Sequence, residues 1–155
     1  NNYSHTEEIE VSIRLPILIP DKYIPDLSLR LSLYRRVGEI QEIEELGLFK
    51  EEMINRFGII PDEFSNYLNV MVLKLLARKC SIAKIYIFKD TYTITFDKSR
   101  AEYSESFIKW VTNNKNKIIL KDSHVIKVNH KIDDAKKQLF DMIDLVKKML
   151  KLLSS

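Results

Sequence analysis

Strand-like segments occur in this chain as two close pairs, and this pairing constrains the fold more than any other feature. Residues 85–88 and 92–96 are largely β-branched or aromatic and flank a short polar turn, which predicts a β-hairpin. Residues 118–120 and 125–128 repeat the pattern around a second polar turn. Because the strands do not alternate regularly with helical segments, the pattern argues against a doubly wound parallel sheet.

The beginning of the chain has the pattern of an extended segment. Apolar and polar residues alternate over 11–15, which is the period of a half-buried strand. Pro16 and Pro20 interrupt further pairing with a sheet. We therefore expect an edge strand or extended arm over residues 1–26, followed by one α+β domain over residues 27–155.

Apolar residues at helical spacing predict about five helices. The first follows Asp26, whose carboxylate can accept hydrogen bonds from the free backbone N–H groups of a first turn. The second spans about Glu42 to Phe57, and Gly47 leaves open a division into two short helices. The last spans about Asp133 to Leu153.

Each of these helices has a predicted apolar face, and those of the first and third bear most on the fold. The face expected for the first consists of Leu27, Leu31, Tyr34 and Val37. The third helix, opened by Pro61, has the clearest stripe: Phe64, Leu68, Met71, Val72, Leu75 and Leu76. A fourth is marked by Tyr103, Phe107, Trp110 and Val111. The expected fold is α+β: a small, mostly antiparallel sheet, made of two hairpins and an N-terminal edge strand, with the helices on one side.

Residues that usually carry chemistry are sparse. The three glycines, Gly38, Gly47 and Gly58, are scattered along helical segments, so no glycine-rich loop brings backbone N–H groups to a phosphate. We expect no phosphate-loop ATPase site, no bound cofactor and no catalytic residue in this domain. Cys80 closes an apolar helix without a local histidine to act as its base, which favours a packed thiol over a nucleophile.

The histidines and paired carboxylates give only weak patterns. His5, His124 and His130 are interpreted as exposed turn residues; alternatively, the last two, which flank one predicted strand, meet around a metal ion. Adjacent carboxylates are interpreted as solvated helix surface rather than as an acid–base pair. They are Glu7-Glu8, Glu44-Glu45, Glu51-Glu52 and Asp133-Asp134.

Charge and composition leave nucleic-acid binding open without requiring it. The net charge is +3 and the apolar fraction is 45%, typical of a globular protein. Lysines occur in two clusters without interleaved aromatic residues: Lys147, Lys148 and Lys151, and Lys115 and Lys117. With a single cysteine and no apolar run near the ~20 residues of a membrane span, we expect a cytoplasmic protein without membrane contact.

Two motifs resemble those of a known family. Residues 19–26 read Ile-Pro-Asp-Lys-Tyr-Ile-Pro-Asp and are followed by Arg-Leu-Ser-Leu-Tyr-Arg-Arg at 30–36; residues 52–58 read Glu-Met-Ile-Asn-Arg-Phe-Gly and are followed by Pro61. In order and spacing they resemble the C-terminal domain of the bacterial transcription-repair coupling factors (Mfd). The resemblance covers nearly the whole chain. It is specific from the first motif through about residue 80, and beyond that residue only the general pattern agrees. Asn55 stands where that family usually has an acidic residue.

The resemblance implies that the chain is the C-terminal domain of a larger protein, an ATP-driven duplex-DNA translocase that removes stalled RNA polymerase and recruits the damage sensor UvrA. The motor and the sites for polymerase and UvrA would lie elsewhere in that protein. This domain would dock on the N-terminal UvrB-like module of the same protein and mask its UvrA-binding surface until polymerase is engaged.

Glu51, Glu52, Asn55 and Arg56 are the predicted docking residues. The alternative interpretation is a capped, solvated helix end in which Arg56 satisfies the carbonyls of its own helix. The segment Tyr23-Ile24-Pro25 is either part of the contact or a staple against the core. The competing functions are a nucleic-acid-binding accessory domain that uses the lysine clusters, and a small enzyme.

Overall fold

The structure, a computed structural model, describes residues 9–99 and 102–155. In chain order its elements are β1 (Glu10–Ser12), α1 (Leu27–Glu39), α2 (Ile43–Phe57), α3 (Asp62–Lys79), β2 (Ile82–Ile87), β3 (Thr91–Phe96), α4 (Glu105–Asn113), β4 (Ile118–Leu120), β5 (Val125–Asn129) and α5 (Ala135–Leu153).

The strands form one five-stranded sheet in the order β1-β2-β3-β5-β4. The two predicted hairpins, β2–β3 and β4–β5, are antiparallel, and β3 joins them by pairing with β5. β1 occupies an edge, as predicted, and it pairs with β2 in the parallel sense. The predicted α+β class is therefore confirmed, with a mixed sheet.

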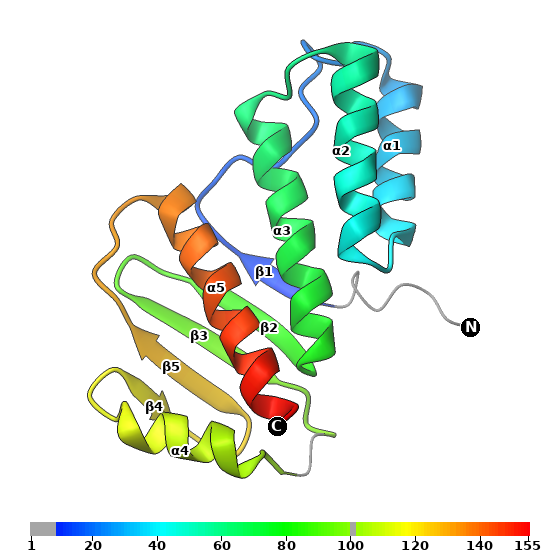
Figure 1. Cartoon of the computed structure of the whole chain (residues 1–155). Helices are drawn as coiled ribbons and strands as arrows, with labels where there is room; N and C mark the ends of the chain where they lie inside the picture. The colour runs from blue at the N-terminus through cyan, green and yellow to red at the C-terminus, as the bar shows by residue number, and fades with distance from the viewer. Residues whose placement is uncertain (1–8, 100–101) are drawn as a thin grey trace.

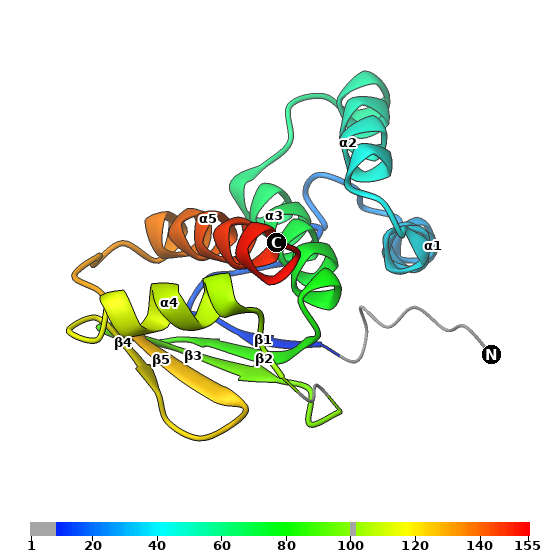
Figure 2. The same cartoon turned by 60° about the horizontal axis from the view of Figure 1, so that its bottom comes forward.

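The helices divide into two groups (Figure 1). α3, α4 and α5 lie over one face of the sheet, while α1 and α2 pack beside α3, away from the sheet (Figure 2). This division follows from α3, because its buried residues belong to two different hydrophobic cores. Leu73, Leu76 and Ala77 join the core between sheet and α5, whereas Phe64 and Leu75 join a second core with α1 and α2.

The segment that precedes α1 belongs to the second core. Ile19 and Ile24 are buried there. Tyr23 packs edge-on against Phe57 and Phe64, with ring centroids 5.9 and 5.7 Å away, and its hydroxyl donates to the carbonyl of Gly58 at 2.8 Å. This segment therefore staples α1 to the end of α2.

The sequence prediction for the buried face of α1 was partly wrong. Leu27 and Leu31 are 59% and 49% exposed, whereas Leu33 and Val37 are buried. Leucine occupies positions 27, 29, 31 and 33, so two faces of this helix are about equally apolar and periodicity could not choose between them. The alternative of a division at Gly47 was also wrong, because α2 is continuous through that residue.

Candidate functional site

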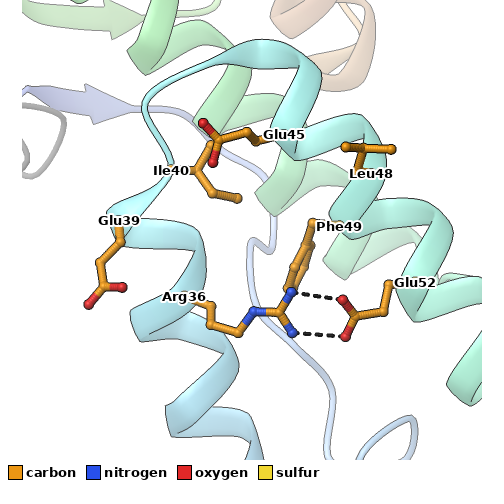
Figure 3. Close-up of a pocket in the computed structure, with 7 residues that line it drawn as sticks. All are labelled: Arg36, Glu39, Ile40, Glu45, Leu48, Phe49 and Glu52. Atoms are coloured by element: carbon orange, nitrogen blue, oxygen red, sulfur yellow. Dashed lines mark hydrogen bonds and ion pairs between the residues drawn. The ribbon is translucent and has the colours of Figure 1, made fainter.

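Glu52 on α2 is held by two arginines, and we call this arrangement the Glu52 clamp. The Arg36 guanidinium of α1 donates two parallel hydrogen bonds to the two Glu52 carboxylate oxygens, each at 2.8 Å. Arg56, one turn further along α2, donates a third at 2.9 Å. Figure 3 shows Arg36 and Glu52 facing each other across the space between the two helices. The fork geometry of arginine suits this bidentate pairing.

The clamp also shifts the acidity of its members. Hydrogen bonds from Arg36 and then from Arg56 lower the pKa of Glu52 to about 2, and the hydrogen bond to Glu52 raises the pKa of Arg36. Each guanidinium lies over an aromatic ring, Arg36 at 5.1 Å from Phe49 and Arg56 at 4.8 Å from Phe57. Glu52 is therefore ionised at neutral pH and fixed in position.

Beside the clamp, a hollow of about 430 Å³ lies between α1 and α2 and is open to solvent (Figure 3). We call it the docking hollow. Its charged lining consists of the carboxylates of Glu39, Glu45 and Glu52 against the guanidinium of Arg36. Its apolar lining consists of Ile40, Leu48 and Phe49, and Leu48 is 66% exposed. A hollow with excess negative charge and an apolar wall suits a long cationic side chain.

The structure brings the predicted docking residues to one end of α2, but it gives them different roles. Glu51 and Asn55 are exposed, and Glu52 is half-buried. Arg56 bonds to Glu52, while the carbonyl of Ile54 near the end of α2 is met by the N–H of Gly58. Sequence reasoning did not identify Arg36 as a site residue, because no periodicity pairs residues on different helices. The signal that could have found it is the family motif at 30–36, which ends in Arg35-Arg36.

The two predicted lysine clusters lie apart. Lys147, Lys148 and Lys151 are exposed on α5. The Ser104 hydroxyl, at the start of α4, donates to the carbonyl of Leu152 at 2.7 Å, so the end of α5 adjoins the start of α4. Lys115 and Lys117 follow the other end of α4, roughly 13 Å along a helix of this length. The end of α5 that carries Lys151 and the loop that carries Lys115 and Lys117 therefore adjoin opposite ends of α4.

His130 is not an exposed turn residue, and that interpretation was wrong. It is buried, its ring stacks on Tyr92 at 4.1 Å, and its two ring nitrogens contact the carbonyl of Phe88 and the N–H of Ile132. His124 lies at the opposite end of β5 and is half-buried. Neither the metal alternative nor a histidine cluster gains support: residues 9–99 and 102–155 contain no group of three or more metal-ligating side chains.

The remaining candidates have structural positions. Cys80 is buried, and its sulfur lies 3.8 Å from the carbonyl oxygen of Val146. The pairs Glu44-Glu45 and Asp133-Asp134 are exposed. His5 and the pair Glu7-Glu8 lie outside the described residues. In the part of the chain that the structure describes, no helix is both long and apolar enough to cross a membrane.

Comparison with known proteins identifies the family. The model of the TRCF domain matches residues 13–107, a range that includes the clamp and the docking hollow. The chain belongs to the TRCF domain family. A transcription-repair-coupling factor of Rickettsia conorii is 35% identical over 124 residues, or 79% of this chain. The Escherichia coli protein of that name is 39% identical over 80 residues, or 52% of this chain.

The fold of the TRCF domain also extends over the part of the chain that lies beyond the family match. A crystal structure of the C-terminal domain of transcription-repair coupling factor has a TM-score of 0.79 at 19% identity, and the comparison covers 95% of this chain and 94% of the other. The chain spans only 11% of the length of the Rickettsia conorii relative. The resemblance seen in the two sequence motifs is therefore confirmed at the level of family and fold.

Proposed function

We propose that this chain is a non-catalytic docking domain of a transcription-repair coupling factor, and that its α1–α2 surface folds back on the UvrB-like N-terminal module of the same protein. Docking masks the UvrA-binding surface of that module, and engagement of stalled RNA polymerase releases it. The motor that translocates on duplex DNA lies elsewhere in the protein. Support comes from the family match and from Glu52, the one predicted docking residue that lines the docking hollow.

The chemistry of the docking hollow carries the proposal. Glu39 and Glu45 leave it with negative charge beyond what Arg36 neutralises against Glu52. The hollow therefore suits a lysine or arginine of the partner, whose methylene stem packs on Leu48 while its cationic group reaches a carboxylate. Ile59, 91% exposed just beyond the end of α2, adds apolar area next to the charged residues.

The Glu52 clamp makes such a contact reversible. When the domain is undocked, the Glu52 carboxylate already has three hydrogen bonds from arginine, so release leaves no buried charge without a partner. An interface that opens must be polar enough for both halves to tolerate water. The charged residues around the hollow then determine specificity more than affinity. Asn55 contributes no charge, so the contact relies on Glu39, Glu45 and Glu51.

The test is binding in trans between this chain and the UvrB-like module of the same coupling factor, measured by isothermal titration or biolayer interferometry. The informative variant is the double reversal Glu39→Lys with Glu45→Lys, because it removes the excess negative charge of the hollow and leaves the Glu52 clamp intact. The matched control is Lys147→Glu with Lys148→Glu on α5, across α3 from the docking hollow.

The proposal predicts that the parent chain binds and that added salt weakens binding. The double reversal lowers affinity at least tenfold, the control leaves it unchanged, and Glu45→Lys alone lowers it several-fold. Circular dichroism checks that each variant is folded. Equal affinity of the parent chain and the double reversal would remove this surface from the docking contact.

A further inference from the structure

One face of the sheet carries none of the helices that the structure describes. α3, α4 and α5 lie over the opposite face (Figure 2), and the side chains on that covered face are buried, among them Ile85, Ile94 and Ile126. Since side chains alternate along a strand, every second residue points to the other face. The described elements leave this face uncovered, and we call it the open sheet face.

A single row of cross-strand partners runs the full width of the open sheet face. It connects all five strands in register: Ser12, Tyr86, Thr93, Lys127 and Ile119. The neighbouring row contains Glu10, Lys84, Thr95 and Val125. Threonine hydroxyls therefore occupy the centre of the face, and lysines stand on both sides of them. Such a surface is too polar for a typical permanent protein interface.

Two aromatic side chains lie on this surface. Tyr86 and Phe88 are two residues apart at the end of β2, with ring centroids 6.1 Å apart and planes inclined at 72°. Phe88 is 50% exposed, so part of this residue is accessible to a ligand. Aromatic rings on an open sheet are the usual platform on which unpaired nucleic-acid bases stack.

The charge of the open sheet face is positive. Lys84 and Lys127 lie in the two rows, where the carboxylate of Glu10 opposes them. At the end of the sheet where β5 ends and β4 begins, next to this face, Lys117 and Lys131 line a hollow of about 360 Å³ together with Asn116, Asn129 and His130. Among the described residues, that lining offers amide and ammonium donors and no carboxylate, which is the donor set that suits a phosphate group.

We propose that the open sheet face binds single-stranded nucleic acid. Bases stack on Phe88 and Tyr86, and phosphates bind to Lys84, Lys127 and the hollow beside Lys117. A duplex does not suit this surface, because its bases are already stacked and paired and cannot reach the rings. This site is separate from the docking hollow. Of the lysines that the sequence predicts for nucleic-acid contact, it includes Lys117 and none of the α5 cluster.

The test uses the 155-residue chain and fluorescein-labelled probes of single-stranded DNA and RNA, each about 12 nucleotides long to match one site, with a matched duplex, in fluorescence anisotropy titrations at low salt. The first variant, Phe88→Ala, removes an exposed ring. The second, Lys84→Gln with Lys127→Gln, removes two charges from the face. Lys147→Gln with Lys148→Gln on α5 is the matched charge control.

We expect single strands to bind more tightly than the duplex. Phe88→Ala should weaken binding roughly fivefold or more, the effect of removing the ring on which one base stacks. The lysine variant should lower the slope of log affinity against log salt by roughly 0.7 for each phosphate that no longer binds a lysine, and the α5 control should leave both quantities unchanged.

Absence of any complex with single strands at low salt would overturn the proposal. So would tighter binding of the duplex, or a loss of binding confined to the α5 variant. Analytical ultracentrifugation of the parent chain and Phe88→Ala tests whether a second copy of the chain occupies the face instead. If Phe88→Ala abolishes self-association and leaves nucleic-acid affinity unchanged, the face pairs copies of the chain and the proposal is wrong.

Discussion

Replacing Glu52 by glutamine tests the physical basis of the candidate site, because it keeps the shape of the side chain and removes its charge. The fall in the pKa of Glu52 from 4.5 to about 2 corresponds to at most about 3.5 kcal/mol. The side chains of Arg36 and Glu52 are 46% and 35% exposed, and solvent screens such pairs strongly. We therefore expect Glu52→Gln to lower the free energy of unfolding by about 1 kcal/mol at pH 7.

The sign of the pH dependence follows from the lowered pKa. A carboxylate that is more acidic in the folded chain contributes its full stabilisation above its unfolded pKa, near pH 4.5, and loses it as the pH falls towards about 2. The difference between the parent chain and Glu52→Gln should thus be constant from pH 7 to about pH 5. It should then shrink as the pH falls towards about 2.

Urea unfolding followed by circular dichroism at a series of pH values measures this difference. Glu51→Gln is the matched control, since Glu51 is exposed next to the clamp, and it should change the free energy of unfolding by less than about 0.5 kcal/mol. A difference between parent and Glu52→Gln that is absent at neutral pH, or that persists unchanged at about pH 2, would refute the reasoning.

Three further predictions concern the body of the domain. Gly58 has a φ of +94°, so Gly58→Ala should cost about 1 kcal/mol of stability in urea unfolding; an unchanged midpoint would contradict this. The Tyr92 hydroxyl donates to Asp141 at 2.8 Å, and Tyr92→Phe should cost about 2 kcal/mol. Burial, and then that hydrogen bond, raises the pKa of Tyr92, so ultraviolet titration should show this tyrosine ionising after the exposed ones. Cys80 is fully buried, and a thiol reagent should modify it only at the rate of unfolding; immediate reaction of the native chain would place the thiol at the surface.

Local sequence signals predicted those parts of the fold that depend on local chemistry. The hairpins followed from β-branched pairs around polar turns, and Asp26 caps α1 as expected, accepting a hydrogen bond from the Leu29 N–H at 3.2 Å. The stripe from Phe64 to Leu76 is buried in large part. These features are encoded over a few residues, where period and turn chemistry suffice.

Features that depend on tertiary arrangement were not predictable in the same way. The parallel pairing of β1 with β2 joins segments that lie far apart along the chain, such as Glu10 and Lys84, and no local pattern specifies its direction. α3 shares its residues between two cores, which a single amphipathic stripe does not reveal. His130 was assigned to the surface because its polarity was visible in the sequence, whereas its burial depends on stacking with Tyr92.

The candidate site was half predictable. The family motif indicated Glu52 and Arg56, and their spacing of one helical turn allows the pair that forms. Arg36 lies on another helix, and only packing of α1 against α2 brings it within 2.8 Å of Glu52. The docking hollow arises from the same packing, so neither its volume nor its excess of carboxylates could be read from the order of residues.

The most direct test of the docking account is the affinity of UvrA for the full-length coupling factor that contains this domain. The parent protein should bind UvrA weakly in the absence of polymerase. The protein with Glu39→Lys and Glu45→Lys should bind it at least tenfold more tightly, approaching the affinity of the isolated UvrB-like module. If the double reversal leaves UvrA affinity unchanged, the α1–α2 surface does not mask that module.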